Sequence, residues 1–339
     1  MNASLGTGLI YLYALTFSVT AIAEDGPTGA LPISKDKFDK IDKREPIPGA
    51  AVGEPSPSMR PWFPAPGDQG SHQQSCTAFA VAYGLKTYLE RIQKAWNDMN
   101  NDHIFSPAYI YNQFATANGT RGIYIDQALD MLLSSGCVPL SVMPYNADDV
   151  SKFPDHDILR QARRFRIDDY AAIEITDVDQ VKSFLASHVP VVIGAFVDWR
   201  DKAWSQNDKG VTDRYLHPND TKYHAMVAIG YNDDKHAFEV MNSWGPNWND
   251  SGFGWVDYDF WPQFVREGYV ARNQKVAPIA PAAGVRAKAL DWLPVGPQGL
   301  INGNWGFPWN VNLKAIKTTS DKKLPEEVRQ YLPQSSSQQ

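Results

Sequence analysis

The sequence has little cysteine and no cluster of basic residues. Its 339 residues include two cysteines, Cys76 and Cys137, so one disulfide bond is the most that could form and a disulfide framework is excluded. No Cys/His pairs stand at metal-ligand spacing, and we expect no cofactor and no metal. The formal net charge is -6. Without a dense Lys/Arg cluster, nucleic acid is not an expected partner.

The composition is that of a globular protein. Apolar residues make up 43% of the chain and charged residues 21%, and the length allows one large domain or two lobes around a substantial core.

The first two dozen residues differ from the rest. Leu5 to Ala23 is nearly free of charge and ends in Ala21-Ile22-Ala23, which is typical of the apolar core and exit of a secretory signal peptide. No Lys or Arg precedes the apolar run, so an uncleaved membrane anchor is the alternative. We expect residues 1–23 to be a signal peptide, with no stable membrane span after cleavage and a secreted or periplasmic protein.

The next segment, residues 24–60, is rich in proline and glycine. Its charged run from Lys35 to Glu45 carries only Phe38 and Ile41 as an apolar pair. This pattern predicts a loosely held short leader or propeptide-like segment.

A helical pattern begins at Cys76 and ends near Asn97. Ser106-Pro107 then combines a cap residue with proline at a first helical position, and Asp126 to Leu133, stopped by Gly136, predicts another helix. The apolar residues of the first pattern recur at spacings of three and four: Phe79, Ala82, Tyr83, Tyr88, Leu89, Ile92 and Trp96.

Beyond about residue 165 the chain changes to β-branched and aromatic runs separated by turns. Helices first and strands second predict an α+β fold of two lobes rather than alternating α/β. We place a domain at 61–275, with a helical lobe at about 69–160 and a β lobe at about 165–275, and an extension of unknown role at 276–339. The expected strands are Val189 to Val197, His224 to Tyr231, Ala237 to Met241 and Gly254 to Tyr258.

Three residues carry the chemistry. Cys76 stands at a helix start, where backbone amides and the helix dipole favour a thiolate. A thiolate paired with a histidine base is a strong nucleophile. His224 heads an apolar strand, and Asn242 ends another, followed by Ser243-Trp244-Gly245.

The order Cys, His, Asn with these flanks resembles the papain-like cysteine peptidase family, in its disulfide-poor bacterial type. Asn242-Ser243-Trp244-Gly245 with Trp248 is the most specific motif, and Cys-Thr-Ala-Phe-Ala at 76–80 is the next. The resemblance covers about residues 60–262. It implies a papain-like fold with a helical left lobe, an antiparallel β right lobe and the active-site cleft between them. It also implies an endopeptidase that cuts protein or peptide substrates through an acyl-enzyme intermediate.

The resemblance also implies a role for each site residue. Cys76 would be the nucleophile, His224 its base and Asn242 the group that orients the imidazole, with Trp244 covering their hydrogen bond from water. Gln69 and the amide of Cys76 would form the oxyanion hole.

The chain departs from the family pattern beside the nucleophile. Gln69 lies seven positions before Cys76 where six are usual, so Gln73 is an alternative oxyanion donor.

Three further departures alter the expected substrate pocket. Gln74 stands where glycine is usual, Thr77 where an aromatic is usual, and Tyr223 where a smaller residue commonly precedes the histidine. We therefore expect Gln74 and Tyr223 to contact substrate.

Some alternatives stay open at this point. His72 is a rival base four residues before Cys76, and Cys137 is expected to be a small buried residue rather than a reactive thiol. The same triad would also support acyl transfer to an amine, and a papain scaffold can serve as a catalytically silent binding protein. The oligomeric state is not predicted.

Overall fold

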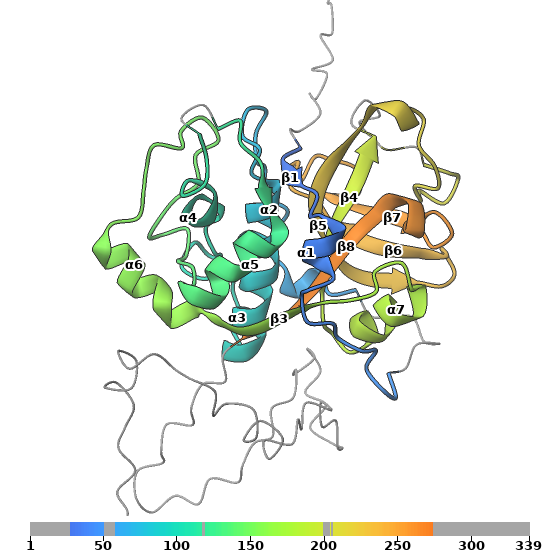
Figure 1. The fold of residues 1–339 in the computed structure, drawn as a ribbon, viewed down its shortest axis with the longest axis horizontal. Helices are drawn as coiled ribbons and strands as arrows, with labels where there is room; N and C mark the ends of the chain where they lie inside the picture. The colour runs from blue at the N-terminus through green and yellow to red at the C-terminus, as the bar shows by residue number, and fades with distance from the viewer. Residues whose placement is uncertain (1–27, 51–57, 117–118, 199–203, 205, 274–339) are drawn as a thin grey trace, which may run out of the picture.

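The computed structural model describes residues 28–50, 58–116, 119–198, 204 and 206–273. Figure 1 shows helices α2 to α6 (residues 76–162) gathered on one side and the sheet with α7 (Val178–Ala186) on the other, with the N-terminal segment that contains β1 (Ala30–Leu31) and α1 (Lys35–Phe38) between them. The predicted signal peptide and the extension at 276–339 lie outside the described residues. In the described part of the chain, no helix is both long and apolar enough to cross a membrane.

The helical lobe is built around one long helix, as predicted from the apolar spacing. It begins at Cys76 as α2 (Cys76–Ala78), continues as the π-helical segment η2 (Phe79–Lys86) and ends as α3 (Thr87–Lys94). Ala95 then adopts a left-handed conformation with φ of 52° and ends the helix.

Shorter helices complete this lobe. Ser106 caps α4 by accepting a hydrogen bond from the Tyr109 N–H, so the predicted cap is confirmed. The helix predicted at Asp126 to Leu133 is also present. The bounds are α4 (Pro107–Tyr111), α5 (Ile125–Ser134), α6 (His156–Ala162), η1 (Arg60–Trp62) and η3 (Arg163–Phe165).

The second lobe is a six-stranded antiparallel sheet in the order β3-β8-β4-β5-β6-β7, which confirms the α+β prediction. All four predicted strands are present, whereas β3 and β8 were not predicted. The strands are β3 (Ile167–Ala172), β4 (Val191–Asp198), β5 (Thr221–Asn232), β6 (Ala237–Met241), β7 (Phe253–Asp257) and β8 (Val265–Asn273). The connections contain α7 (Val178–Ala186), η4 (Pro218–Asp220) and α8 (Trp261–Phe264).

The two lobes share one apolar core, in which β5 packs against the long helix. Residues 223–231 of β5 are buried without interruption. A Cβ placed on Gly84 of the helix would lie 3.0 Å from Val227 Cγ2, so the glycine permits close contact between helix and strand. Burial of each large apolar side chain contributes roughly 1.5–3 kcal/mol.

The described part of the leader is attached to the domain by backbone pairing, although only Gly29 and Ala30 of it are buried. β1 (Ala30–Leu31) pairs in parallel with β2 (Ile123–Tyr124), and α1 (Lys35–Phe38) follows. The Arg44 N–H then donates to the Ala172 carbonyl of the edge strand β3 at 2.8 Å. Sequence patterning missed this pairing because backbone hydrogen bonds, rather than an apolar stripe, hold much of the leader.

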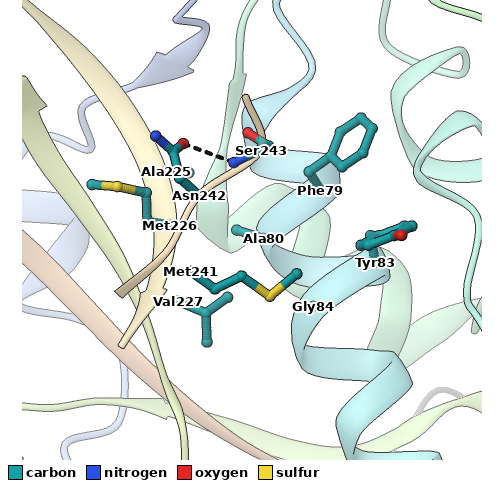
Figure 2. Close-up of a pocket in the computed structure, with 10 residues that line it drawn as sticks. All are labelled: Phe79, Ala80, Tyr83, Gly84, Ala225, Met226, Val227, Met241, Asn242 and Ser243. Carbon is teal, nitrogen blue, oxygen red and sulfur yellow. Dashed lines mark hydrogen bonds between the residues drawn. The ribbon is translucent and has the colours of Figure 1, made fainter. Parts of the chain in front are cut away.

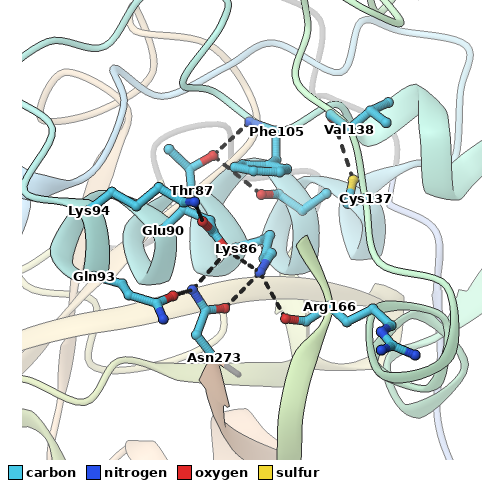
Figure 3. A network of polar contacts seen from close by, with 11 residues as sticks. Lys86, Thr87, Glu90, Gln93, Lys94, Phe105, Cys137, Val138, Arg166 and Asn273 are labelled. Atoms are coloured by element: carbon cyan, nitrogen blue, oxygen red, sulfur yellow. Dashed lines mark hydrogen bonds and ion pairs between the residues drawn. The ribbon is translucent and has the colours of Figure 1, made fainter. Parts of the chain in front are cut away.

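A buried polar network joins the long helix to the last strand (Figure 3). The fully buried Lys86 donates from Nζ to Glu90 Oε1 at 2.6 Å and to Asn273 Oδ1 at 2.7 Å. Asn273 Nδ2 donates to the same Glu90 oxygen at 2.9 Å. Burial lowers the pKa of Lys86 and the Glu90 charge opposes this. The network fixes the end of β8 on the helical lobe.

We predict that Lys86→Ala lowers the free energy of unfolding by about 3–5 kcal/mol, because it leaves the Glu90 carboxylate buried without its main partner. Urea unfolding followed by circular dichroism measures this change. Lys94→Ala is the matched control, since Lys94 contacts the same carboxylate at 3.5 Å from a part-exposed position and should cost under about 1 kcal/mol. Equal effects of the two substitutions would contradict the prediction.

Candidate active site

Cys76 lies at the start of α2 and is fully buried. Burial raises the pKa of its thiol to about 11, against the opposing effect of hydrogen bonds from the backbone of Ala225, Ala30 and Gly29. Ala225 belongs to β5 in the sheet lobe, and the other two residues belong to the leader. The thiol is therefore enclosed between the two lobes and covered by the leader.

His224 and Asn242 form a hydrogen-bonded pair in the sheet lobe. His224 Nε2 lies 2.7 Å from Asn242 Oδ1, which also accepts the Ser243 N–H at 2.7 Å. Because that N–H requires an acceptor, the amide oxygen is fixed and Nε2 of the imidazole is the donor. Burial lowers the pKa of His224 to about 4, with the Asn242 bond opposing.

The imidazole is consequently neutral, with the lone pair on Nδ1. Among the described residues, Nδ1 is buried and has no hydrogen-bond partner. A neutral imidazole with an unengaged Nδ1 is in the protonation state of a base.

Aromatic side chains cover the pair. The centroid of the Trp244 ring system lies 4.8 Å from that of the His224 ring. Trp204 and Trp248 contact Trp244 edge to face, with centroid separations of 6.2 Å and 5.5 Å. These rings pack around the imidazole of the His224–Asn242 pair.

The two candidate oxyanion donors point in different directions. The fully buried Gln69 accepts at Oε1 from Ser243 Oγ at 2.6 Å and donates from Nε2 to the Gln73 carbonyl at 3.1 Å. Gln73 donates from Nε2 to the Asn146 carbonyl at 2.6 Å. The Gln69 amide therefore lies next to the Asn242 segment, whereas the Gln73 amide is engaged by a different loop.

Two residues without a role in the sequence analysis position this loop. Tyr145 OH donates to the Gln69 carbonyl at 2.8 Å and lies 2.9 Å from Oγ of Ser75, the residue directly before Cys76. Such contacts join residues about 70 positions apart, so no local signal in the sequence reveals them.

The predicted substrate residues lie near the leader. Gly29 of the leader lies so close to Gln74 that a Cβ added to the glycine would be 2.3 Å from the Gln74 Cβ. Tyr223 OH donates to the buried Glu267 at 2.6 Å. Glu267 also accepts a backbone hydrogen bond from Ile33 of the leader, and burial raises the pKa of this carboxyl.

The other candidates lie apart from this arrangement. His72 is exposed and pairs with Ser71 Oγ at 3.1 Å, which does not suit a base for a buried thiol. Cys137 is buried and its thiol contacts the Ser106 carbonyl at 3.5 Å, as expected for a packed residue. Both cysteines are unpaired.

A small pocket lies between the lobes beside Asn242. In Figure 2, residues of the long helix face strand residues across it, with Asn242 and Ser243 at one end. It is lined by Phe79, Ala80, Tyr83, Gly84, Ala225, Met226, Val227, Met241, Asn242 and Ser243.

One group among the described residues has the spacing of a metal site. The ligand atoms of His236, Asp257 and Asp259 lie within 4.8 Å of one another. Asp257 Oδ1 already accepts the Asp259 N–H at 2.8 Å, and the His236 and Asp259 side chains are exposed. The candidate catalytic residues do not include any of these three.

The chain is similar to several proteolytic enzymes in sequence. Residues 67–260 match the model of the papain family of cysteine proteases. Peptidase 1 of Dermatophagoides pteronyssinus is 30% identical over 152 residues, which cover 42% of this chain and 43% of that protein. The cysteine protease of Blomia tropicalis is 24% identical over 188 residues, 54% of each chain. The match thus spans about half the length of these relatives.

Similarity of fold extends further than similarity of sequence. The crystal structure of xylellain, a cysteine protease from Xylella fastidiosa, superposes with a TM-score of 0.60 and 23% identity, covering 75% of this chain and 98% of that one. At this identity the likeness concerns the fold. Because the family model spans more than half of the sequence, this chain belongs to the papain family of cysteine proteases.

Proposed function

We propose that this cysteine peptidase is an endopeptidase that cuts peptide bonds through a Cys76 thiolate and an acyl-enzyme intermediate. The observation that carries the proposal is the 2.7 Å hydrogen bond between His224 Nε2 and Asn242 Oδ1. This bond leaves the lone pair of the imidazole on Nδ1. The neighbouring Ala225 backbone lies against the thiol. The start of the long helix, with Cys76, and the start of the buried part of β5, with His224 and Ala225, therefore support a nucleophile on one lobe and an oriented base on the other.

In the first half of the reaction, His224 Nδ1 takes the Cys76 proton and the sulfur attacks the carbonyl carbon of the substrate. A C–S bond forms and the carbonyl oxygen becomes an oxyanion. As the tetrahedral intermediate collapses, the C–N bond breaks. The proton on Nδ1 then passes to the departing amine and a thioester remains.

In the second half, water replaces the amine. His224 Nδ1 accepts a proton from the water as its oxygen attacks the thioester carbonyl. Collapse breaks the C–S bond, the proton returns to sulfur, and the carboxylic acid product leaves. Asn242 holds the imidazole through both halves, because its oxygen is itself fixed by the Ser243 N–H.

We further propose that Gln69, rather than Gln73, stabilises the oxyanion together with the Cys76 N–H. The Gln69 Oε1 accepts from Ser243, the residue next to Asn242, while its Nε2 donates to the Gln73 carbonyl. The Gln73 amide instead donates to the Asn146 carbonyl, in a different loop. Donors that are fixed before the charge develops stabilise a transition state at little reorganisation cost.

The leader supports a proposal about regulation, namely that residues 24–60 include an inhibitory segment. Its residues Gly29 and Ala30 lie against the thiol. With the leader in place, burial keeps the Cys76 thiol and the His224 imidazole neutral through the pKa values of about 11 and about 4. An enclosed, neutral thiol is a poor nucleophile.

The last part of the proposal is that the protein is exported. The apolar run that ends in Ala21-Ile22-Ala23 supports a signal peptide over residues 1–23 and a secreted or periplasmic enzyme. The short leader would then keep the peptidase inactive until it has left the compartment where it is made.

We predict that Cys76→Ala and His224→Ala each lower kcat for peptide hydrolysis by about 10⁶-fold, the order found when a nucleophile or base is removed. Asn242→Ala should be milder, since only orientation is lost. Turnover of a quenched peptide and thermal melting are measured on the same samples. Hydrolysis by a well-folded Cys76→Ala protein would refute the mechanism.

Gln69→Ala is expected to lower kcat by about 10²–10³ with a small change in KM, because one oxyanion donor acts chiefly in the transition state. Gln73→Ala is the matched control and should leave kcat within about threefold. Steady-state kinetics on one peptide decide between them. The reverse result would assign the oxyanion role to Gln73.

A bulkier residue at position 29 should displace the leader, since a Cβ there would meet Gln74 at 2.3 Å. In the full chain, we expect Gly29→Leu to speed alkylation of Cys76 by iodoacetamide at least about tenfold, because the thiol regains its reactivity. The control is Pro32→Leu, which places the same side chain at an exposed position of the leader. Equal alkylation rates in both variants would refute the inhibitory role.

A further inference from the structure

The path of the leader shows which surfaces its side chains touch. Gly29 and Ala30 lie against the Cys76 thiol, and Leu31 pairs with Tyr124 of β2. Seven residues beyond Ala30, the ammonium group of Lys37 forms an ion pair with the Asp126 carboxylate. The groups that bind these leader residues therefore lie along one continuous segment of chain that also covers the thiol.

Asp126 belongs to the first turn of α5, and its side chain is only 2% exposed. Its Oδ2 lies 2.5 Å from Lys37 Nζ. Its Oδ1 is buried and has no hydrogen-bond partner among the described residues. A buried carboxylate is costly unless it is paired, so Asp126 depends on a cation from outside its own helix.

Tyr124 completes the site. Lys37 Nζ lies 5.4 Å from the centroid of the Tyr124 ring, within the range of a cation–π interaction. A carboxylate and an aromatic face together bind an ammonium or guanidinium group on a flexible side chain. The Lys37 side chain is 52% exposed, so the cation reaches the site from the solvent side.

A second acidic residue that the leader contacts, Glu267, does not depend on the leader for a partner. Glu267 accepts hydrogen bonds from Tyr223 OH at 2.6 Å and Tyr269 OH at 2.5 Å. Both donors belong to the sheet and remain when the leader leaves. Glu267 is thus satisfied without the leader, whereas Asp126 loses its ion-pair partner Lys37.

We propose that Asp126 and Tyr124 form a subsite for a lysine or arginine side chain of the peptide substrate, and that Lys37 occupies this subsite in the inhibited protein. This inference rests on the proposed endopeptidase activity and names its substrate class. A peptide with a basic side chain at this position restores the ion pair of Asp126. A neutral side chain leaves the carboxylate unpaired, so peptides with neutral residues there are cut more slowly.

The test compares two quenched peptides that differ at one position, lysine in one and norleucine in the other. The position is first found with a library in which lysine is moved along a fixed peptide. Norleucine keeps the length of the side chain and removes the ammonium group. The ratio of kcat/KM for the two peptides is measured within each full-length variant, so changes in leader binding or folded fraction cancel.

For the unsubstituted protein we expect the lysine peptide to be favoured by about 10- to 100-fold, as is typical of one charge-assisted hydrogen bond. Asp126→Asn should reduce this ratio to within about threefold of unity. Asp130→Asn is the matched control: it removes the same charge one turn later in α5, where Asp130 accepts from Tyr170 OH at 2.6 Å. It should leave most of the preference.

A second variant tests the leader itself. Lys37→Met should raise the hydrolysis of both peptides by one common factor, because the leader loses its ion pair while the subsite is unchanged. An equal ratio in the unsubstituted protein and in Asp126→Asn would overturn the subsite and leave the peptidase intact. Failure of the Gly29→Leu variant, in which the leader is displaced, to cut any peptide, together with failure of an epoxide to label its Cys76, would overturn the peptidase proposal and this inference with it.

Discussion

The packing of β5 against the long helix is the contact on which the rest of the structure depends. Cys76 begins that helix and His224 lies in β5, so neither lobe alone holds both groups. The uninterrupted burial of residues 223–231 and the close approach permitted by Gly84 fix the distance between the lobes. Close-packed interiors do not deform continuously, and the relative position of thiol and imidazole is therefore set by apolar packing rather than by polar contacts within the site.

Local patterns predicted the elements that carry the candidate site, for physical reasons that are easy to trace. The helix from Cys76 buries one apolar face, which leaves spacings of three and four residues in the sequence. The strand from His224 is buried on both faces, which leaves a continuous apolar run. β8 leaves no such pattern, because Arg266 and Glu267 interrupt it. Its place between β3 and β4 depends on pairing with strands far away in the chain, which no local window contains.

Some site residues were predicted from the sequence and others were not, because only some of them stand in a local motif. Cys76, His224 and Asn242 stand in short motifs with recognisable flanks, and Gln69 stands in one with an extra residue before Cys76. Asp126 appeared only as the start of a helix, since its burial and its contact with Lys37 arise from the leader folding back across 89 positions of sequence. The charged run of the leader suggested a solvated segment, and only tertiary structure reveals that its backbone is bonded to the sheet.

The backbone hydrogen bonds between the leader and β3 divide the leader into two parts that make different contacts. Residues 29–37 lie over the thiol and the acidic side chains, whereas residues 42–44 exchange hydrogen bonds with Ala172, whose N–H donates to the Asp42 carbonyl at 2.8 Å. β3 is the outermost strand of the sheet on that side, and an uncovered edge is a template for pairing with another chain. Maturation that removed the whole leader would expose this edge and favour self-association. The contacts of residues 42–44 with this edge are separate from those of residues 29–37 with the site, so the leader both pairs with an edge strand and covers the thiol.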